Sequence, residues 1–153
     1  MIRALVFLSL VAAADQPVRF SHKTHTEAAK LTCKDCHTMP DPGERAGTPA
    51  TSKCMACHTA VKTDSPHIAK IAAWHKAKRP VPWVRIYEIP GYVFFSHKNH
   101  TDAGVKCESC HGPVAERDVI TKEVKHNMGT CMECHRQSKA PNECTSCHEK
   151  LGQ

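Results

Sequence analysis

Every cysteine of the chain belongs to a short group that ends in histidine. The ten cysteines and five of the twelve histidines form five copies of the pattern C-x-x-C-H. The groups are Cys33, Cys36 and His37; Cys54, Cys57 and His58; Cys107, Cys110 and His111; Cys131, Cys134 and His135; and Cys144, Cys147 and His148. This pattern is the c-type haem attachment signature: two thiols bind the porphyrin, and the histidine binds the iron. The sequence therefore predicts five covalently bound haem c groups, with these five histidines as proximal iron ligands.

Zinc binding and disulfide bonding are the two competing uses of these cysteines. A zinc site would use C-x-x-C pairs, but it does not require a histidine after every second cysteine. A disulfide framework does not require that histidine either. Because all five groups share it and no cysteine is left over, the pattern favours haem.

Two further histidine pairs precede haem motifs within a repeated string. The pattern V-x-F-S-H-K-x-H-T-x-A occurs at 18–28 and again at 93–103. It contributes His22 and His25 in the first copy, and His97 and His100 in the second. Each haem has only one free axial position, so the two histidines of a pair must serve different irons if both bind. We expect this sharing to hold neighbouring haems close together.

Three histidines remain outside the motifs and the repeated pairs. The fifth distal ligand is expected to be His126. Met128, two residues later, is the alternative, and its thioether would raise the reduction potential of that haem. His67 and His75 would then have no iron to bind. They are interpreted as partly buried histidines that bind no iron, and His75 could pack on a porphyrin or hydrogen-bond a propionate.

The elements that position these residues are expected to be short. The best helix signal spans 64–78, where Ser65 is a natural N-cap, Pro66 suits the first helical position, and Ile68, Ile71, Ala72 and His75 share one face. Residues 80–95 read as an extended segment, and six of the eight aromatic residues lie between Trp74 and Phe95. We expect this segment to form a wall packed between the two haem clusters, with a docking surface for a partner as the alternative. The predicted fold is mainly irregular with short α-helices, little or no β-sheet and a haem-filled core.

The repeat divides the chain into modules. Residues 18–58 form a module with two haem sites, 64–92 a helix plus an aromatic linker, and 93–150 a module with three sites. Residues 1–14 resemble a secretory signal, because Arg3 precedes an apolar stretch and Ala12-x-Ala14 resembles a cleavage site; an uncleaved anchor is the alternative. Export to the periplasm or another extracytoplasmic space is therefore expected.

The formal net charge of +6 does not indicate nucleic-acid binding. Five haems would add on the order of ten propionate charges, so most of the lysine excess is interpreted as internal compensation. The expected partners are redox proteins.

Residues 95–148 resemble the small three-haem cytochromes of the class III (c3/c7) group. The likeness lies in F-x-H-x-x-H, the seven-residue step to the first C-x-x-C-H, the histidine before the next motif, and the closely following last motif. The resemblance implies that His97 binds the haem of His111, His100 that of His135, and His126 that of His148. By the same pattern, it implies that His22 binds the haem of His37, and His25 that of His58.

The span from His22 to the end also resembles the pentahaem cytochrome subunits of alternative complex III and related membrane redox complexes. The likeness is carried by Trp83 to Pro90, Cys110-His111-Gly112-Pro113-Val114 and Met128-Gly129-Thr130-Cys131. The expected function is electron transfer, and three roles remain open: a soluble shuttle, a subunit of a quinol- or molybdopterin-linked complex, or a link in a cytochrome filament. The rival class is a multihaem reductase, which needs a haem with an open axial site.

Overall fold

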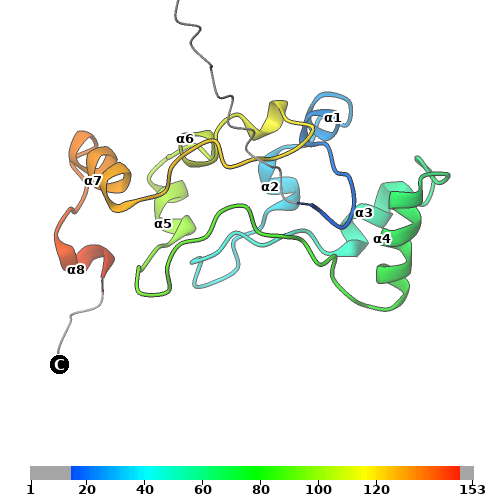
Figure 1. Cartoon of the computed structure of the whole chain (residues 1–153), viewed down its shortest axis with the longest axis horizontal. Coiled ribbons are helices and arrows are strands. Elements are labelled where there is room, and N and C mark those ends of the chain that lie inside the picture. Colours follow the sequence, from blue (N-terminus) through cyan, green and yellow to red (C-terminus); the bar gives the residue numbers. More distant parts are fainter. Residues whose placement is uncertain (1–14, 149–153) are drawn as a thin grey trace, which may run out of the picture.

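The structure is a computed structural model that describes residues 15–148, so the expected signal at 1–14 lies outside the described residues. Short helices are joined by long irregular segments (Figure 1). The helices are α1 (His22–Glu27), α2 (Cys33–Cys36), α3 (Thr51–His58), α4 (Pro66–Lys76), α5 (His97–Asp102), α6 (Glu108–His111), the 3-10 helix η1 (Val114–Glu116), α7 (Met128–Gln137) and α8 (Cys144–Cys147).

Between residues 15 and 148 there is no β-strand, and a single isolated bridge joins Val93 to His148. The prediction of a mainly irregular fold with short helices is confirmed. No helix in this range is long and apolar enough to cross a membrane.

Helix α4 forms where its sequence signals predict it. Ser65 adopts extended dihedrals as the N-cap, and Pro66 occupies the first helical position, where its missing N–H costs no hydrogen bond. The apolar face of the helix turns Ile71 into the core and packs α4 against α3. This packing supports the helix that carries the second haem motif.

The apolar core is small and lies at one end of the molecule. Val18, Ile71 and Val81 are the buried apolar residues of the described chain. The partly buried side chains that pack around them are Cys54, Met55, Ile68, Trp74 and Trp83. Apolar burial stabilises a fold by about 25 cal/mol for each Å² removed from water. Three buried side chains cover little area, so this core stabilises the fold little by itself. The arrangement agrees with a fold completed by its cofactors.

Each copy of the repeat contacts a loop of the other module. The Lys23 amide of α1 donates to the Arg117 carbonyl beside η1 at 3.1 Å. The Lys98 amide of α5, at the equivalent repeat position, donates to the Gly43 carbonyl in the loop after α2 at 3.0 Å. Each ligand helix is therefore anchored by the loop that follows the first haem motif of the other module.

Gly43 is required where α5 meets this loop. Its φ is +82°, and a Cβ built there would overlap the Lys98 Cβ. Gly43→Ala should therefore lower the free energy of unfolding of the haem-loaded protein by about 2–3 kcal/mol, in a denaturant titration. Gly104→Ala is the control, because Gly104 has φ +79° but open space around it. It should cost only about 1 kcal/mol, and equal losses for the two variants would contradict the close approach.

Candidate functional site

The haem motifs lie on short helices that place their thiols together. Each pair of cysteines is separated by three positions, so both side chains lie on one face of a helical turn. In α2, the Thr32 amide donates to an Asp35 carboxylate oxygen at 2.7 Å and closes the first turn. In α7, the Asn127 side chain accepts from the Thr130 amide at 2.9 Å. The ten cysteines are free thiols, exposed or half-buried.

The two thiols of the second motif differ in their surroundings. Cys54 is half-buried and packs against the apolar core, whereas Cys57 is exposed. Helix α3 turns one face toward α4, and the Cys57 carbonyl accepts from the Ala60 and Val61 amides at 3.0 Å each.

The two repeated strings form matching helices. Ser21 caps α1 by accepting from the Thr24 amide at 2.9 Å, and Ser96 caps α5 by accepting from the Asn99 amide at 3.2 Å. The first histidine of each pair opens the helix and the second lies one turn later. The ring pairs show that the two histidines face two different haem motifs.

The first histidine of each repeat faces the first haem motif of its own module. The rings of His22 and His37 have centroids 6.3 Å apart and planes 8° from parallel. The rings of His97 and His111 are 6.4 Å apart and 4° from parallel. A metal–imidazole bond is about 2.0–2.1 Å long, so two imidazoles that bind one metal from opposite sides have centroids about 6 Å apart. Both pairs match that separation.

The second histidine of each repeat faces the next haem motif along the chain. The centroids of His25 and His58 are 6.1 Å apart with an interplanar angle of 63°. Those of His100 and His135 are 5.9 Å apart at 51°. The structure thus brings together four of the five histidine pairs that the resemblance implied.

Hydrogen bonds orient these rings so that Nε2 is free. His25 Nδ1 lies 2.7 Å from the Ser21 carbonyl oxygen, and His100 Nδ1 lies 2.8 Å from that of Ser96. The same Nδ1-to-carbonyl bond is made by His37 to Gly47, His58 to Val61, His97 to Glu44, His135 to Pro141 and His148 to Tyr92. An Nδ1–H that donates to a carbonyl leaves Nε2 as the metal-binding atom.

Burial favours the neutral form of two of these histidines. Burial, together with the neighbouring His37 and His25, lowers the pKa of His22 to about 4. Burial also lowers the pKa of His111, with His126 and His97 among its neighbours. The neutral imidazole is the metal-binding form. The buried Nδ1 of His22 has no hydrogen-bond partner in the described part of the chain.

Two phenylalanines hold the repeated histidines and were not singled out as site residues. Phe95 lies edge-on to His97 at 4.8 Å and stacks on His100 at 4.6 Å. Phe20 makes the same two contacts with His22 and His25, at 4.8 and 4.3 Å. The signal was present in the sequence, because a phenylalanine precedes both histidine pairs at the same spacing.

His126 lies away from its expected partner. Its Nε2 lies 2.7 Å from the Cys110 carbonyl oxygen, and its ring stacks on Tyr87 at 4.5 Å. Its nearest proximal histidine is His111, at 5.8 Å and 72°. The ring of His148 instead faces Tyr92, at 6.0 Å and 26°. His126 therefore differs from the other expected ligands, because the nitrogen that would bind iron is used in a hydrogen bond.

The remaining candidates lie apart from the ring pairs. Met128, the alternative fifth ligand, begins α7, and its side chain is 66% exposed. His67 Nδ1 accepts from the Arg19 amide at 3.4 Å, and His75 Nδ1 lies 3.3 Å from the Thr51 hydroxyl. His67 is half-buried, as expected, whereas His75 is exposed. His67 joins α4 to the segment before α1, and His75 joins α4 to α3.

The thiols of each motif are close enough to those of a neighbouring motif to affect their pKa values. Burial raises the pKa of four motif thiols, and in each case a thiol of another motif raises it further. The pairs are Cys54 with Cys36, Cys33 with Cys107, Cys110 with Cys134, and Cys131 with Cys147. This succession agrees with Figure 1, in which α3, α2, α6, α7 and α8 follow one another across the molecule. In Figure 1, α3 lies at one end of the molecule, and α7 and α8 lie at the other.

The donor set fits haem better than a bare metal ion. No cluster of three or more His, Cys, Asp or Glu side chains that could hold a metal ion occurs among residues 15–148. The histidines instead face each other in pairs across a gap of the correct width, beside pairs of free thiols. Two axial nitrogens and two nearby thiols are the attachments that covalent haem requires.

Comparisons with known proteins agree with this geometry. Residues 8–85 match the Class III cytochrome C family, and residues 93–150 match the family of cytochrome c7 and related cytochrome c. The chain is also 30% identical, over 167 residues, to the multihaem cytochrome c subunit of menaquinone reductase from Nitratidesulfovibrio vulgaris. That alignment covers 92% of this chain and 80% of the relative.

Proposed function

The chain belongs to the class III cytochrome c family of multihaem electron-transfer proteins, and we propose that it carries electrons along a line of five haem c sites. The electron-transfer role and the class of cofactor follow from the family. The number of sites, their ligands and their order are the proposal. The observation that carries it is the set of four facing imidazole pairs with centroid separations between 5.9 and 6.4 Å.

The five C-x-x-C-H motifs supply the proximal histidines and the thioether cysteines. The exposed Cys57 is one of these cysteines. Four distal ligands come from the repeats: His22 opposite His37, His25 opposite His58, His97 opposite His111, and His100 opposite His135. The fifth distal ligand, opposite His148, is assigned to His126 by family resemblance, with Met128 as the alternative. The contact of His126 Nε2 with Cys110 makes this fifth position the one that an experiment must decide.

Bound haem supplies reversible one-electron chemistry at its iron. The residues of this chain hold the imidazoles in place. The Ser21 and Ser96 carbonyls fix two rings by accepting from Nδ1, and Phe20 and Phe95 stack against the same rings. Rings fixed before the iron changes oxidation state need little rearrangement, and little rearrangement favours fast electron exchange.

The meeting of motif thiols supports an order that differs from the sequence. The line runs through the sites of His58, His37, His111, His135 and His148. The first and third motifs are neighbours at its centre, where burial and the Cys107 thiol raise the pKa of Cys33. The second motif, although it lies between them in sequence, occupies one end.

Location and assembly are part of the proposal. The c-type attachment motifs and the expected signal at 1–14 support an exported, extracytoplasmic protein. The relative from Nitratidesulfovibrio vulgaris is named as a subunit of menaquinone reductase, which supports a place in a membrane quinone-linked complex over a free shuttle or a filament.

A haem count combined with EPR and near-infrared spectra tests the proposed sites. Five haems per chain are expected, of which at least four are low-spin with two histidine ligands. A near-infrared band typical of methionine-ligated ferric haem would assign Met128, and its loss in Met128→Leu would verify that assignment. A count other than five would contradict the proposal, as would a high-spin signal from any of the four paired sites.

A further inference from the structure

One aromatic residue of the linker lies against a proximal histidine of the second module. The linker joins α4 to α5 and runs from one end of the molecule toward the other (Figure 1). Its Trp83 lies edge-on to Phe20, with ring centroids 6.1 Å apart and planes at 75°. Its Tyr87 is half-buried and lies edge-on to His111, at 4.9 Å and 87°. Tyr87 therefore contacts an expected iron ligand, although it belongs neither to a haem motif nor to a repeat.

The ring of His111 is held differently from the other four proximal rings. In each of those, Nδ1 lies beside a backbone carbonyl oxygen, that of Gly47, Val61, Pro141 or Tyr92. Such a bond is the usual means of fixing the orientation of a metal-binding imidazole. Among the described residues, no hydrogen bond joins the His111 ring to a carbonyl, and aromatic rings surround it instead.

The hydroxyl of Tyr87 fixes the other end of this side chain. It donates to the His111 carbonyl oxygen at 3.4 Å, and it accepts from the Glu123 and Val124 amides at 3.0 and 3.3 Å. Glu123 is held in turn by two bonds from the Arg117 guanidinium, at 2.6 and 2.9 Å. The phenol is thus anchored on the third haem motif at both ends, with its ring on the His111 ring and its hydroxyl on the His111 backbone.

We propose that Tyr87 is a positioning residue, which holds the imidazole of His111 parallel to that of His97 and thereby sets the electronic structure of the third haem. This role rests on the proposed function, which places a haem between these two histidines. Their planes are 4° from parallel, the smallest angle of the four facing pairs. Aromatic rings at this separation prefer an edge-to-face arrangement, so rotation of His111 would lose its contact with Tyr87.

The contact of Tyr87 with His126 does not decide this role. The two rings stack at 4.5 Å and 29°, while His126 Nε2 lies 2.7 Å from the Cys110 carbonyl oxygen. If His126 bound the fifth haem instead, Tyr87 would keep its ring contact and its hydrogen bond with His111. The role of Tyr87 at the third haem is therefore independent of how the fifth distal ligand is assigned.

The second tyrosine of the chain provides a matched control. Tyr92 lies beside another proximal histidine, His148, at 6.0 Å and 26°, and it is 70% exposed. The Nδ1 of His148 is fixed by the backbone carbonyl of Tyr92, which a change of side chain does not remove. Tyr87→Leu and Tyr92→Leu therefore delete the same side chain beside a proximal histidine, but only Tyr87→Leu removes the group that orients the ring.

The measurement is the EPR spectrum of the oxidised, haem-loaded protein. The g values of a low-spin ferric haem depend on the angle between its two axial imidazole planes. The signal that disappears in Cys107→Ala/Cys110→Ala belongs to the third haem, and it should be that of near-parallel planes. Tyr87→Leu should reduce this signal by more than about half, because His111 then adopts a range of orientations. Tyr87→Phe keeps the ring without its hydroxyl anchor, so it should retain the signal but broaden it, and Tyr92→Leu should leave it unchanged.

An unchanged third-haem signal in Tyr87→Leu would overturn the positioning role, as would an equal loss in Tyr92→Leu. If Tyr87→Leu does not assemble with five haems, Tyr87→Phe decides, and a third-haem signal as sharp as that of the unchanged protein would overturn the role. A haem count on the unchanged protein keeps the two proposals apart. Fewer than five haems, or a high-spin third haem, would contradict the proposed function itself, whereas five haems with a signal insensitive to Tyr87 would contradict only the role of Tyr87.

Discussion

Replacing His100 with methionine should raise the reduction potential of the haem held by His135, and it should leave the haem held by His111 unchanged. The His100 ring faces His135 at 5.9 Å, whereas His111 faces His97 at 6.4 Å. Axial ligands set haem potentials over a range of about 0.8 V, so exchanging histidine for methionine should shift one site by on the order of 0.1 V. EPR-monitored potentiometric titration would resolve this shift, together with the new near-infrared band of a methionine-ligated ferric haem.

Variants that lack a single haem identify the affected site. In a Cys131→Ala/Cys134→Ala background, which cannot attach the fourth haem, His100→Met should produce no new methionine band. In a Cys107→Ala/Cys110→Ala background the band should persist. The reverse pattern would mean that His100 serves the motif nearest to it in sequence. His97→Met is the matched control and should show that reverse pattern.

Removing the second haem site should leave the other four coupled, whereas removing the first should separate one haem from the rest. In the proposed order the first and third motifs are neighbours, because Cys107 raises the pKa of Cys33, and the second motif neighbours the first, because Cys36 raises the pKa of Cys54. In Cys33→Ala/Cys36→Ala, the haem of His58 should titrate as an independent one-electron centre, and its electron exchange with the others should slow by orders of magnitude. Neighbouring haems otherwise titrate as coupled sites.

Replacing both Cys54 and Cys57 with alanine gives the opposite test. This double variant removes a terminal site in the proposed order, but a central site in the order of the sequence. The remaining four haems should stay coupled and equilibrate at the wild-type rate. If the variant instead isolated the haem of His37, electrons would follow the sequence order, and the proposed line would be wrong. Cys54→Ala/Cys57→Ala still decides between the two orders if Cys33→Ala/Cys36→Ala, which lacks a central haem, fails to fold.

Local patterns in the sequence predict most of the candidate haem-binding groups. The C-x-x-C-H motif, the two histidines three residues apart and the Ser65-Pro66 helix start depend on neighbours within one helical turn. At such separations the chain has few alternative geometries. The prediction of short helices in an irregular fold also depended only on such patterns, together with the scarcity of aromatic residues for a core. The same patterns could not distinguish the exposed Cys57 from the half-buried Cys54, because burial depends on how α3 packs against α4.

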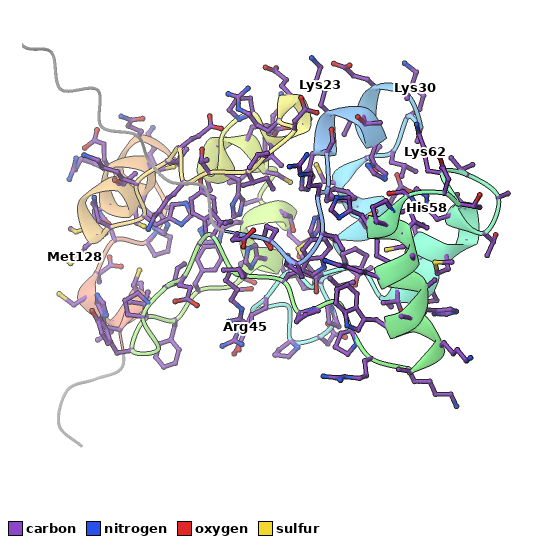
Figure 2. The ribbon with its side chains drawn as sticks, turned by 45° about the vertical axis from the view of Figure 1, so that its right-hand side comes forward. Lys23, Lys30, Arg45, His58, Lys62 and Met128 are labelled. Carbon is purple, nitrogen blue, oxygen red and sulfur yellow. The ribbon has the colours of Figure 1, made fainter. Side chains whose placement is uncertain are left out.

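The sequence by itself determined which cysteines and histidines can bind haem, and the tertiary structure decided where those sites lie relative to one another. Cys33 and Cys107 come from different modules, and Gly43 of the first module packs against Lys98 of the second. The separation of His126 from His148 depends on Tyr87, which comes from the linker and stacks on His126. The placement of His58 and Met128 toward opposite ends of the molecule depends on how the two modules are arranged (Figure 2). These contacts join residues far apart in the chain, and such pairings depend on the whole path of the backbone, which no local spacing specifies.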